Sequence, residues 1–163
     1  MDKKTYHDFS YIVSYISPRL QKYLNKINEE IISKIQEIRI RCDRPIVIIT
    51  DIGSSFLTVN GNLSSLLSFN CVIPTENDIS DTISKMCDYS IHSFNEDMAK
   101  GFITLPNGAR VGLSGEAVYD KNIIKGIKDI DGLNIRFPHF FSNLSDKLIK
   151  YVFKENLSNL LLV

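Results

Sequence analysis

One stretch, residues 101–119, constrains the fold of this 163-residue chain more than any other. Two apolar runs flank the tripeptide Pro106-Asn107-Gly108. Proline presets the backbone for a turn, and an Asn-Gly pair tolerates the positive φ angles that a tight hairpin requires. The stretch therefore predicts two antiparallel strands joined by a short turn.

The second strand of this hairpin carries residues that a plain strand does not need. Gly112 and Gly115 lie inside it, although glycine weakens a strand. Glycine at such positions marks a bulge, or a place where another backbone or a ligand comes close. Arg110 stands just after the turn, among small and apolar neighbours. We expect this arginine to have a specific task.

The first part of the chain shows helical spacing. Ser17-Pro18 places a good N-cap before a proline at the first helical position, and Asn28 before two glutamates repeats the signal. Two or three short helices are therefore predicted. Their apolar residues recur every three or four positions: Ile12, Ile16, Leu20, Leu24, Ile27 and Ile31.

The spacing then changes to two, which is typical of half-buried strands. Thr75 with Asp78 predicts the capped start of another helix, and a short helix is expected over residues 93–100, ended by Gly101. Asp131-Gly132 predicts a turn before a last strand over residues 133–137. The fold class expected is α+β, with short N-terminal helices followed by a mainly antiparallel sheet with helices packed on it.

Charge and cysteine content limit the function classes. The formal net charge is +0, so bulk electrostatics favours neither nucleic acid nor an anionic membrane as partner. Three distant cysteines fit a reduced cytoplasmic protein better than a disulfide framework. No apolar run approaches the ~18 residues of a membrane span. We expect a cytoplasmic protein.

Four motifs occur in an order that identifies a resemblance. They are Glu37-Ile38-Arg39-Ile40-Arg41 with Arg44-Pro45, Gly101-Phe102-Ile103-Thr104-Leu105-Pro106, Gly108-x-Arg110-Val111-Gly112-Leu113-x-Gly115, and Leu133-Asn134-Ile135-Arg136. With them the chain resembles the stage III sporulation AA family of endospore-forming bacteria. That family is itself similar to the secretion ATPases of type II and type IV systems and to pilus-retraction motors. The resemblance covers nearly the whole chain.

The resemblance implies an ATPase that uses ATP and Mg²⁺ as a full-length protein. No G-x-x-x-x-G-K-[ST] loop occurs in the 163 residues, so we expect this chain alone to bind neither and to be inactive. In the family, a strand that matches residues 160–163 runs into such a loop. We therefore expect residues 1–157 to form an N-terminal domain and residues 158–163 to begin a P-loop ATPase domain. From the pattern alone, a last strand of the first domain is the alternative.

The resemblance also implies partners and a place in the cell. The expected assembly is a homo-hexamer formed through the ATPase domain. The expected partners are membrane-embedded proteins of a sporulation channel. The domain would lie in the mother-cell cytoplasm at the periphery of that channel, where it would regulate and oligomerise a motor that energises transfer between mother cell and forespore.

Arg110 and Arg136 are the candidate site residues. The N-terminal domains of secretion ATPases offer arginines to nucleotide bound at the ATPase domain. By resemblance, both residues would contact nucleotide phosphate as arginine fingers, and a planar guanidinium suits phosphate oxygens. The alternative is a partly exposed strand arginine paired with an acid such as Glu116 or Asp129.

A small basic stripe of Arg39, Arg41 and Arg44 is predicted, because alternate strand residues share a face. It could contact nucleic-acid phosphates, but a solvated face or a subunit interface fits the zero net charge better. A nucleic-acid-binding module and a plain oligomerisation scaffold stay as alternative functions. The residues expected to be structural or to form an interface are Arg39, Arg41, Arg44, Gly101, Gly108, Gly112 and Gly115.

Other kinds of site find no support in the sequence. The letters of a KH-domain GXXG loop occur at residues 112–115, but they lie within a predicted strand. His7, His92 and His139 lack ligand spacing with one another or with the cysteines. No serine lies in a nucleophile elbow. We expect no catalytic residue and no metal site in this chain.

Overall fold

The computed structural model of the chain describes residues 3–88, 100–121 and 123–137. Its first elements are three short helices: α1 (Lys3–Ser14), α2 (Pro18–Leu24) and α3 (Glu29–Ile32). Both predicted caps are confirmed. The Ser17 side chain accepts a hydrogen bond from the Leu20 N–H, and the Asn28 side chain accepts one from the Glu30 N–H.

The strands form a single seven-stranded sheet with the order β4-β3-β2-β1-β7-β6-β5, and every neighbouring pair is antiparallel. The last strand in the chain, β7, lies between β1 and β6, so it joins two sets of strands that are far apart in sequence. The strands are β1 (Ile35–Arg41), β2 (Arg44–Thr50), β3 (Gly53–Leu57), β4 (Leu63–Ser64), β5 (Phe102–Thr104), β6 (Arg110–Asp120) and β7 (Ile123–Arg136).

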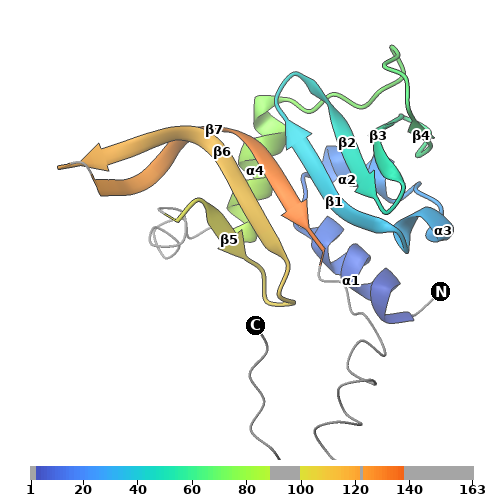
Figure 1. The fold of residues 1–163 in the computed structure, drawn as a ribbon, viewed down its shortest axis with the longest axis horizontal. Helices are drawn as coiled ribbons and strands as arrows, with labels where there is room; N and C mark the ends of the chain where they lie inside the picture. The colour runs from blue at the N-terminus through green and yellow to red at the C-terminus, as the bar shows by residue number, and fades with distance from the viewer. Residues whose placement is uncertain (1–2, 89–99, 122, 138–163) are drawn as a thin grey trace, which may run out of the picture.

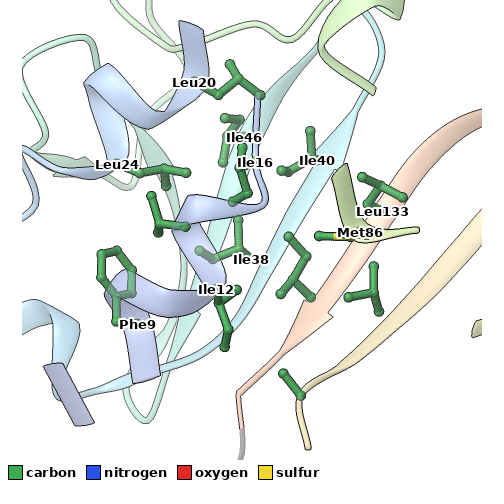
Figure 2. Close-up of a cluster of buried hydrophobic side chains, with 14 of the residues drawn as sticks. Phe9, Ile12, Ile16, Leu20, Leu24, Ile38, Ile40, Ile46, Met86 and Leu133 are labelled. Carbon is green, nitrogen blue, oxygen red and sulfur yellow. The ribbon is translucent and has the colours of Figure 1, made fainter. Parts of the chain in front are cut away.

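One face of the sheet is covered by helices, among them α4 (Glu76–Met86), which lies behind β6 and β7 in Figure 1. Alternate strand residues point into the core under these helices. Figure 2 shows Ile12 of α1, Ile38 of β1 and Leu133 of β7 in this cluster, and all three side chains are fully buried. The α+β fold expected from the sequence is confirmed.

The hairpin predicted over residues 101–119 is also confirmed, as β5 and β6. Its turn is closed by a 2.8 Å hydrogen bond from the Leu105 N–H to the Ala109 carbonyl oxygen, and Gly108 has a φ of 85°. The pairing of β6 with β7 shifts register around Gly115. A Cβ on Gly115 would lie 2.7 Å from the Lys128 carbonyl oxygen. Gly115 therefore serves a bulge, which is one of the two roles expected for it.

The turn predicted at Asp131-Gly132 is wrong, because β7 runs through these residues without a break. Gly132 pairs with Arg41 on β1 and with Ser114 on β6. A Cβ on Gly132 would lie 2.5 Å from the Arg41 side chain. The glycine thus makes room for an arginine that packs across the strand. The helix predicted over residues 93–100 and the domain start at residues 158–163 lie outside the described residues, except for Lys100.

Asp78 links α4 to the start of α2. Its buried carboxylate accepts hydrogen bonds from the Ser17 hydroxyl at 2.7 Å, from the Thr75 N–H at 2.8 Å and from the Arg19 guanidinium. Burial by itself raises the pKa of this carboxyl group. The hydrogen bonds from Arg19, Thr75 and Ser17 outweigh burial and hold the pKa well below its usual range. The capping box predicted from Thr75 and Asp78 is therefore part of a larger tertiary link.

We expect Asp78→Asn to lower the free energy of unfolding at pH 7 by about 1.5–3 kcal/mol, because it removes the charge of a buried acceptor that binds the partly exposed Arg19, Ser17 and Thr75. Since the folded pKa is depressed, the contribution of Asp78 is complete above the ordinary carboxyl pKa of 3.8 and is lost as the pH falls below it. Urea unfolding at pH 7 and pH 3 measures both effects. The exposed Asp81→Asn on the same helix is the control, expected within about 0.5 kcal/mol of wild type. Equal losses in the two variants would contradict this role of Asp78.

Candidate functional site

Arg110 and Arg136 lie directly opposite each other. Arg110 begins β6 and Arg136 ends β7, and the two residues are register partners. Their sequence neighbours Val111 and Ile135 are fully buried in the core. Both arginines therefore project from the opposite face of the sheet, which we call the open face. The structure thus brings the two predicted site residues together, although 25 residues separate them in the sequence.

A buried carboxylate stands next to this pair. Glu37 on β1 is the register partner of Arg136, and it is only 9% exposed. Its Oε2 lies 3.4 Å from Nε of Arg136, and its Oε1 accepts a 2.7 Å hydrogen bond from Nε of Arg39. One carboxylate therefore balances two guanidinium groups and holds both against the sheet.

Arg110 has a different environment. Its guanidinium carbon lies 5.9 Å from the centre of the Phe102 ring, a cation–π distance. Within the described part of the chain, no carboxylate forms an ion pair with it. Glu116 and Asp129, the acids considered as partners, both pair with Lys128 instead, at 3.0 and 3.7 Å. Glu116 and Asp129 are therefore not the partners of the candidate arginines. Pairing with an acid, the alternative considered from the sequence, nevertheless holds for Arg136, whose partner is Glu37.

A small hollow of about 220 Å³ lies beside the two arginines, and both of them line it. The buried Oδ1 atom of Asn134 has no hydrogen-bond partner among the described residues. A Cβ on Gly112 would stay 3.7 Å from its nearest neighbour, so sterics do not demand glycine there. Gly112 instead leaves its part of the hollow without a side chain. The lining residues are Phe102, Arg110, Gly112, Asn134 and Arg136.

The predicted basic stripe continues the open face. Arg39 is the register partner of Asn134, and Arg41 is that of Gly132. Arg41 packs over Gly132, while Arg44 is exposed opposite Arg41 at the end of the β1–β2 hairpin. The stripe predicted on β1 and the two candidate arginines therefore belong to one surface.

Sequence reasoning missed three residues of this surface: Glu37, Phe102 and Asn134. Glu37 has the same strand parity as Arg39 and Arg41, so its position on their face follows from the two-residue period. Its burial and its contact with Arg136 depend on the pairing of β1 with β7, which has no local signal. Phe102 and Asn134 likewise reach the hollow through strand register alone.

Two searches of the described residues concern other kinds of site. Among these residues, no cluster of three or more histidine, cysteine or acidic side chains has the arrangement of a metal site. No helix in the described ranges has the length and apolar character needed to cross a bilayer.

Two of the glycines expected to be structural have a backbone that explains them. Gly101 and Gly108 both have φ angles of 85°, a conformation that favours glycine.

Two comparisons with known proteins, one with family profiles and one with curated sequences, find the same family. The profile of the family described as Sporulation stage III, protein AA, matches residues 7–163. A curated relative, Stage III sporulation protein AA of Bacillus subtilis (strain 168), is 26% identical over 152 residues, which cover 93% of this chain and 45% of the relative. The chain thus spans about half the length of that relative.

A match among solved structures has low sequence identity. It is the VirB11 ATPase from the Brucella suis type IV secretion system in complex with sulphate. The match covers 94% of this chain and 38% of that chain, with 11% sequence identity and a TM-score of 0.43.

Because Glu37 is buried, removing its charge is expected to destabilise the protein more than removing the charge of an exposed glutamate. Glu37→Gln is expected to lower the free energy of unfolding by about 1.5–3 kcal/mol, because it removes the charge that accepts a hydrogen bond from Arg39 and forms an ion pair with Arg136. The control is Glu116→Gln, which removes the exposed pair with Lys128 and is expected to cost less than about 1 kcal/mol. Chemical denaturation of both variants is the measurement. A smaller loss for Glu37→Gln than for Glu116→Gln would show that the buried carboxylate does not organise the open face.

Proposed function

The chain belongs to the sporulation stage III protein AA family, and on that premise we propose that it is the N-terminal regulatory and oligomerisation domain of a sporulation ATPase that resembles secretion motors. The matched region covers only 45% of the B. subtilis relative. The 163 residues contain no phosphate-cradling G-x-x-x-x-G-K-[ST] loop. We assign the parts that hold ATP and Mg²⁺ to the remainder of the full-length protein.

The observation that carries this proposal is the direct opposition of Arg110 and Arg136 across β6 and β7. Like charges opposite each other in a sheet repel, so an anion between them stabilises the pair. Glu37 supplies that charge for Arg136, whereas no described carboxylate supplies it for Arg110. Two guanidinium groups around one hollow suit the oxygens of a phosphoryl group.

Asn134 adds to the chemistry of the hollow. Its carboxamide carries two donors and an acceptor, and the two ends of the group have nearly the same shape. The acceptor end lacks a partner in the described residues, so Oδ1 is available to accept a hydrogen bond from a hydroxyl group of a ligand. These groups bind and orient phosphate, but none of them activates a water molecule.

The proposed mechanism is a rigid-body movement of this domain. ATP held by the ATPase domain, in the same subunit or in a neighbour, attracts Arg110 and Arg136 and draws the open face inward. Loss of the γ-phosphate after hydrolysis weakens that attraction and releases the domain. In a hexameric ring at a membrane channel of the mother cell, this movement would transmit the energy of hydrolysis to the channel.

Alanine variants of the two arginines test the assignment in the full-length protein. Arg110→Ala and Arg136→Ala are each expected to lower ATP turnover by about 10³–10⁵, the range measured for finger arginines. The matched control is Arg44→Ala, which removes an exposed arginine from the same face at the far end of the stripe and is expected to leave turnover unchanged. Steady-state hydrolysis and thermal melts of each variant separate a catalytic loss from unfolding.

Two results would overturn the proposal in different ways. Wild-type turnover in both alanine variants would remove the arginine assignment, and stable rings with that turnover would favour a plain scaffold. Salt-dependent binding of single-stranded nucleic acid, lost when Arg39 and Arg41 are replaced, would favour a nucleic-acid-binding module.

A further inference from the structure

The strands β6 and β7 extend beyond the rest of the sheet as a two-stranded arm (Figure 1). β5 pairs with β6 only as far as Gly112, and β1 pairs with β7 only from Gly132 onward. Between these points β6 and β7 pair only with each other among the described residues. We define the arm as residues 115–121 and 123–131. The carbonyl oxygen of Asp131, at the base of the arm, accepts a hydrogen bond from the Cys42 N–H, but no other strand of the described ranges pairs with the edges of the arm farther out. Such unpaired strand edges are templates for association.

The end of the arm is apolar and exposed. A two-stranded hairpin is marginally stable in water without a surface that covers it. Exposed apolar groups gathered in one place mark an interaction site. Four large side chains, which we call the tip, share this end of the arm, with exposed fractions between 38% and 64%: Val118, Tyr119, Ile123 and Ile124.

A complementary surface lies at the base of the same arm. A hollow of about 500 Å³ opens between α4 and β7. Ile83, Ile127 and Ile130 form apolar walls, while Glu76, Asp129 and Asp131 add carboxylates. Lys128 is the only described cation in the lining, and it pairs with Glu116 and Asp129. The hollow is therefore apolar inside with an excess of negative charge.

We propose that the arm of one copy of this chain docks into the hollow between α4 and β7 of a second copy. The tip supplies apolar side chains for the isoleucine walls. Two exposed lysines next to the tip, Lys121 and Lys125, complement the excess carboxylates around the hollow, with Asp120 the one described acid beside them.

This contact joins two different surfaces of the molecule, so it is head-to-tail. A copy that inserts its arm still offers its own hollow. A copy whose hollow is filled still has its own arm free. Such heterologous contacts generate a closed ring when the rotation between copies closes, and an open filament when it does not. The inference rests on the oligomerisation part of the proposed function. It does not depend on Arg110 or Arg136, so the test of self-association and the test of ATP turnover fail separately.

A mixing experiment with the 163-residue chain tests the proposal. The tip variant carries Tyr119→Ser and Ile124→Ser, and the hollow variant carries Ser80→Arg, an exposed position of α4 that lines the hollow. Ile52→Ser and Ser65→Arg are matched controls at exposed positions away from both surfaces. Sedimentation velocity over a range of concentrations measures self-association, and circular dichroism checks that each variant is folded.

The expected result is self-association of the wild-type chain and of both controls, weakened at least about tenfold in the tip variant and in the hollow variant, as for loss of an anchor side chain. A mixture of the two variants should form a 1:1 dimer and nothing larger, because the tip variant keeps an intact hollow and the hollow variant keeps an intact tip. A monomeric wild-type chain would overturn the proposal. If the hollow variant associates as strongly as the wild-type chain, the proposal is also overturned, in favour of tip-to-tip contact.

Cysteine crosslinking gives a second, independent readout. Cys42 lines the hollow, so Tyr119→Cys under mild copper–phenanthroline oxidation is expected to yield a covalent dimer. The dimer should vanish in a Cys42→Ser background. Persistence of the same dimer without Cys42 would contradict docking at this hollow. A wild-type chain that binds anionic phosphatidylserine vesicles through the tip, without self-association, would assign the arm to a membrane and overturn the proposal.

Discussion

The position of β7 between β1 and β6 is the constraint on which the rest of the structure depends. β1 to β4 form one antiparallel set early in the chain, and β5 with β6 forms another much later. β7 pairs with both sets through its last residues, from Gly132 to Arg136, and its earlier residues continue with β6 alone. One strand therefore joins the two sets into a single sheet, places Arg136 between Arg110 and Glu37, and forms half of the arm.

The two-residue period of the strands then divides the sheet into two chemically different faces. Leu133 and Ile135 enter the core beneath the helices, while Asn134 and Arg136 face the open side. Across that side, Arg110, Arg136 and Glu37 stand in one row. Repulsion between the two arginines is only partly offset by Glu37, because that carboxylate is shared with Arg39. A surface with this unbalanced charge is suited to an external anion, which is why we place phosphate recognition there.

Local features of the fold were predictable because their causes are local. Caps at Ser17, Asn28 and Thr75 and the turn at Gly108 follow from hydrogen bonding and backbone sterics within a few residues. The opposition of Arg110 and Arg136 was not predictable, since it depends on strand pairing across the whole sheet. The prediction of a turn at Asp131-Gly132 was wrong for the same reason. Gly132 is needed because the Arg41 side chain on a neighbouring strand packs against it, not because the backbone turns there.

The central claim is that Arg110 and Arg136 form a surface for nucleotide phosphate held elsewhere in the full-length protein. The most direct test is the structure of the full-length protein with Mg²⁺ and a non-hydrolysable ATP analogue. The account predicts guanidinium nitrogens of both arginines within about 2.7–3.0 Å of phosphate oxygens, in the same subunit or in a neighbour. Bound nucleotide with both arginines directed into solvent, or buried against a protein partner, would contradict it.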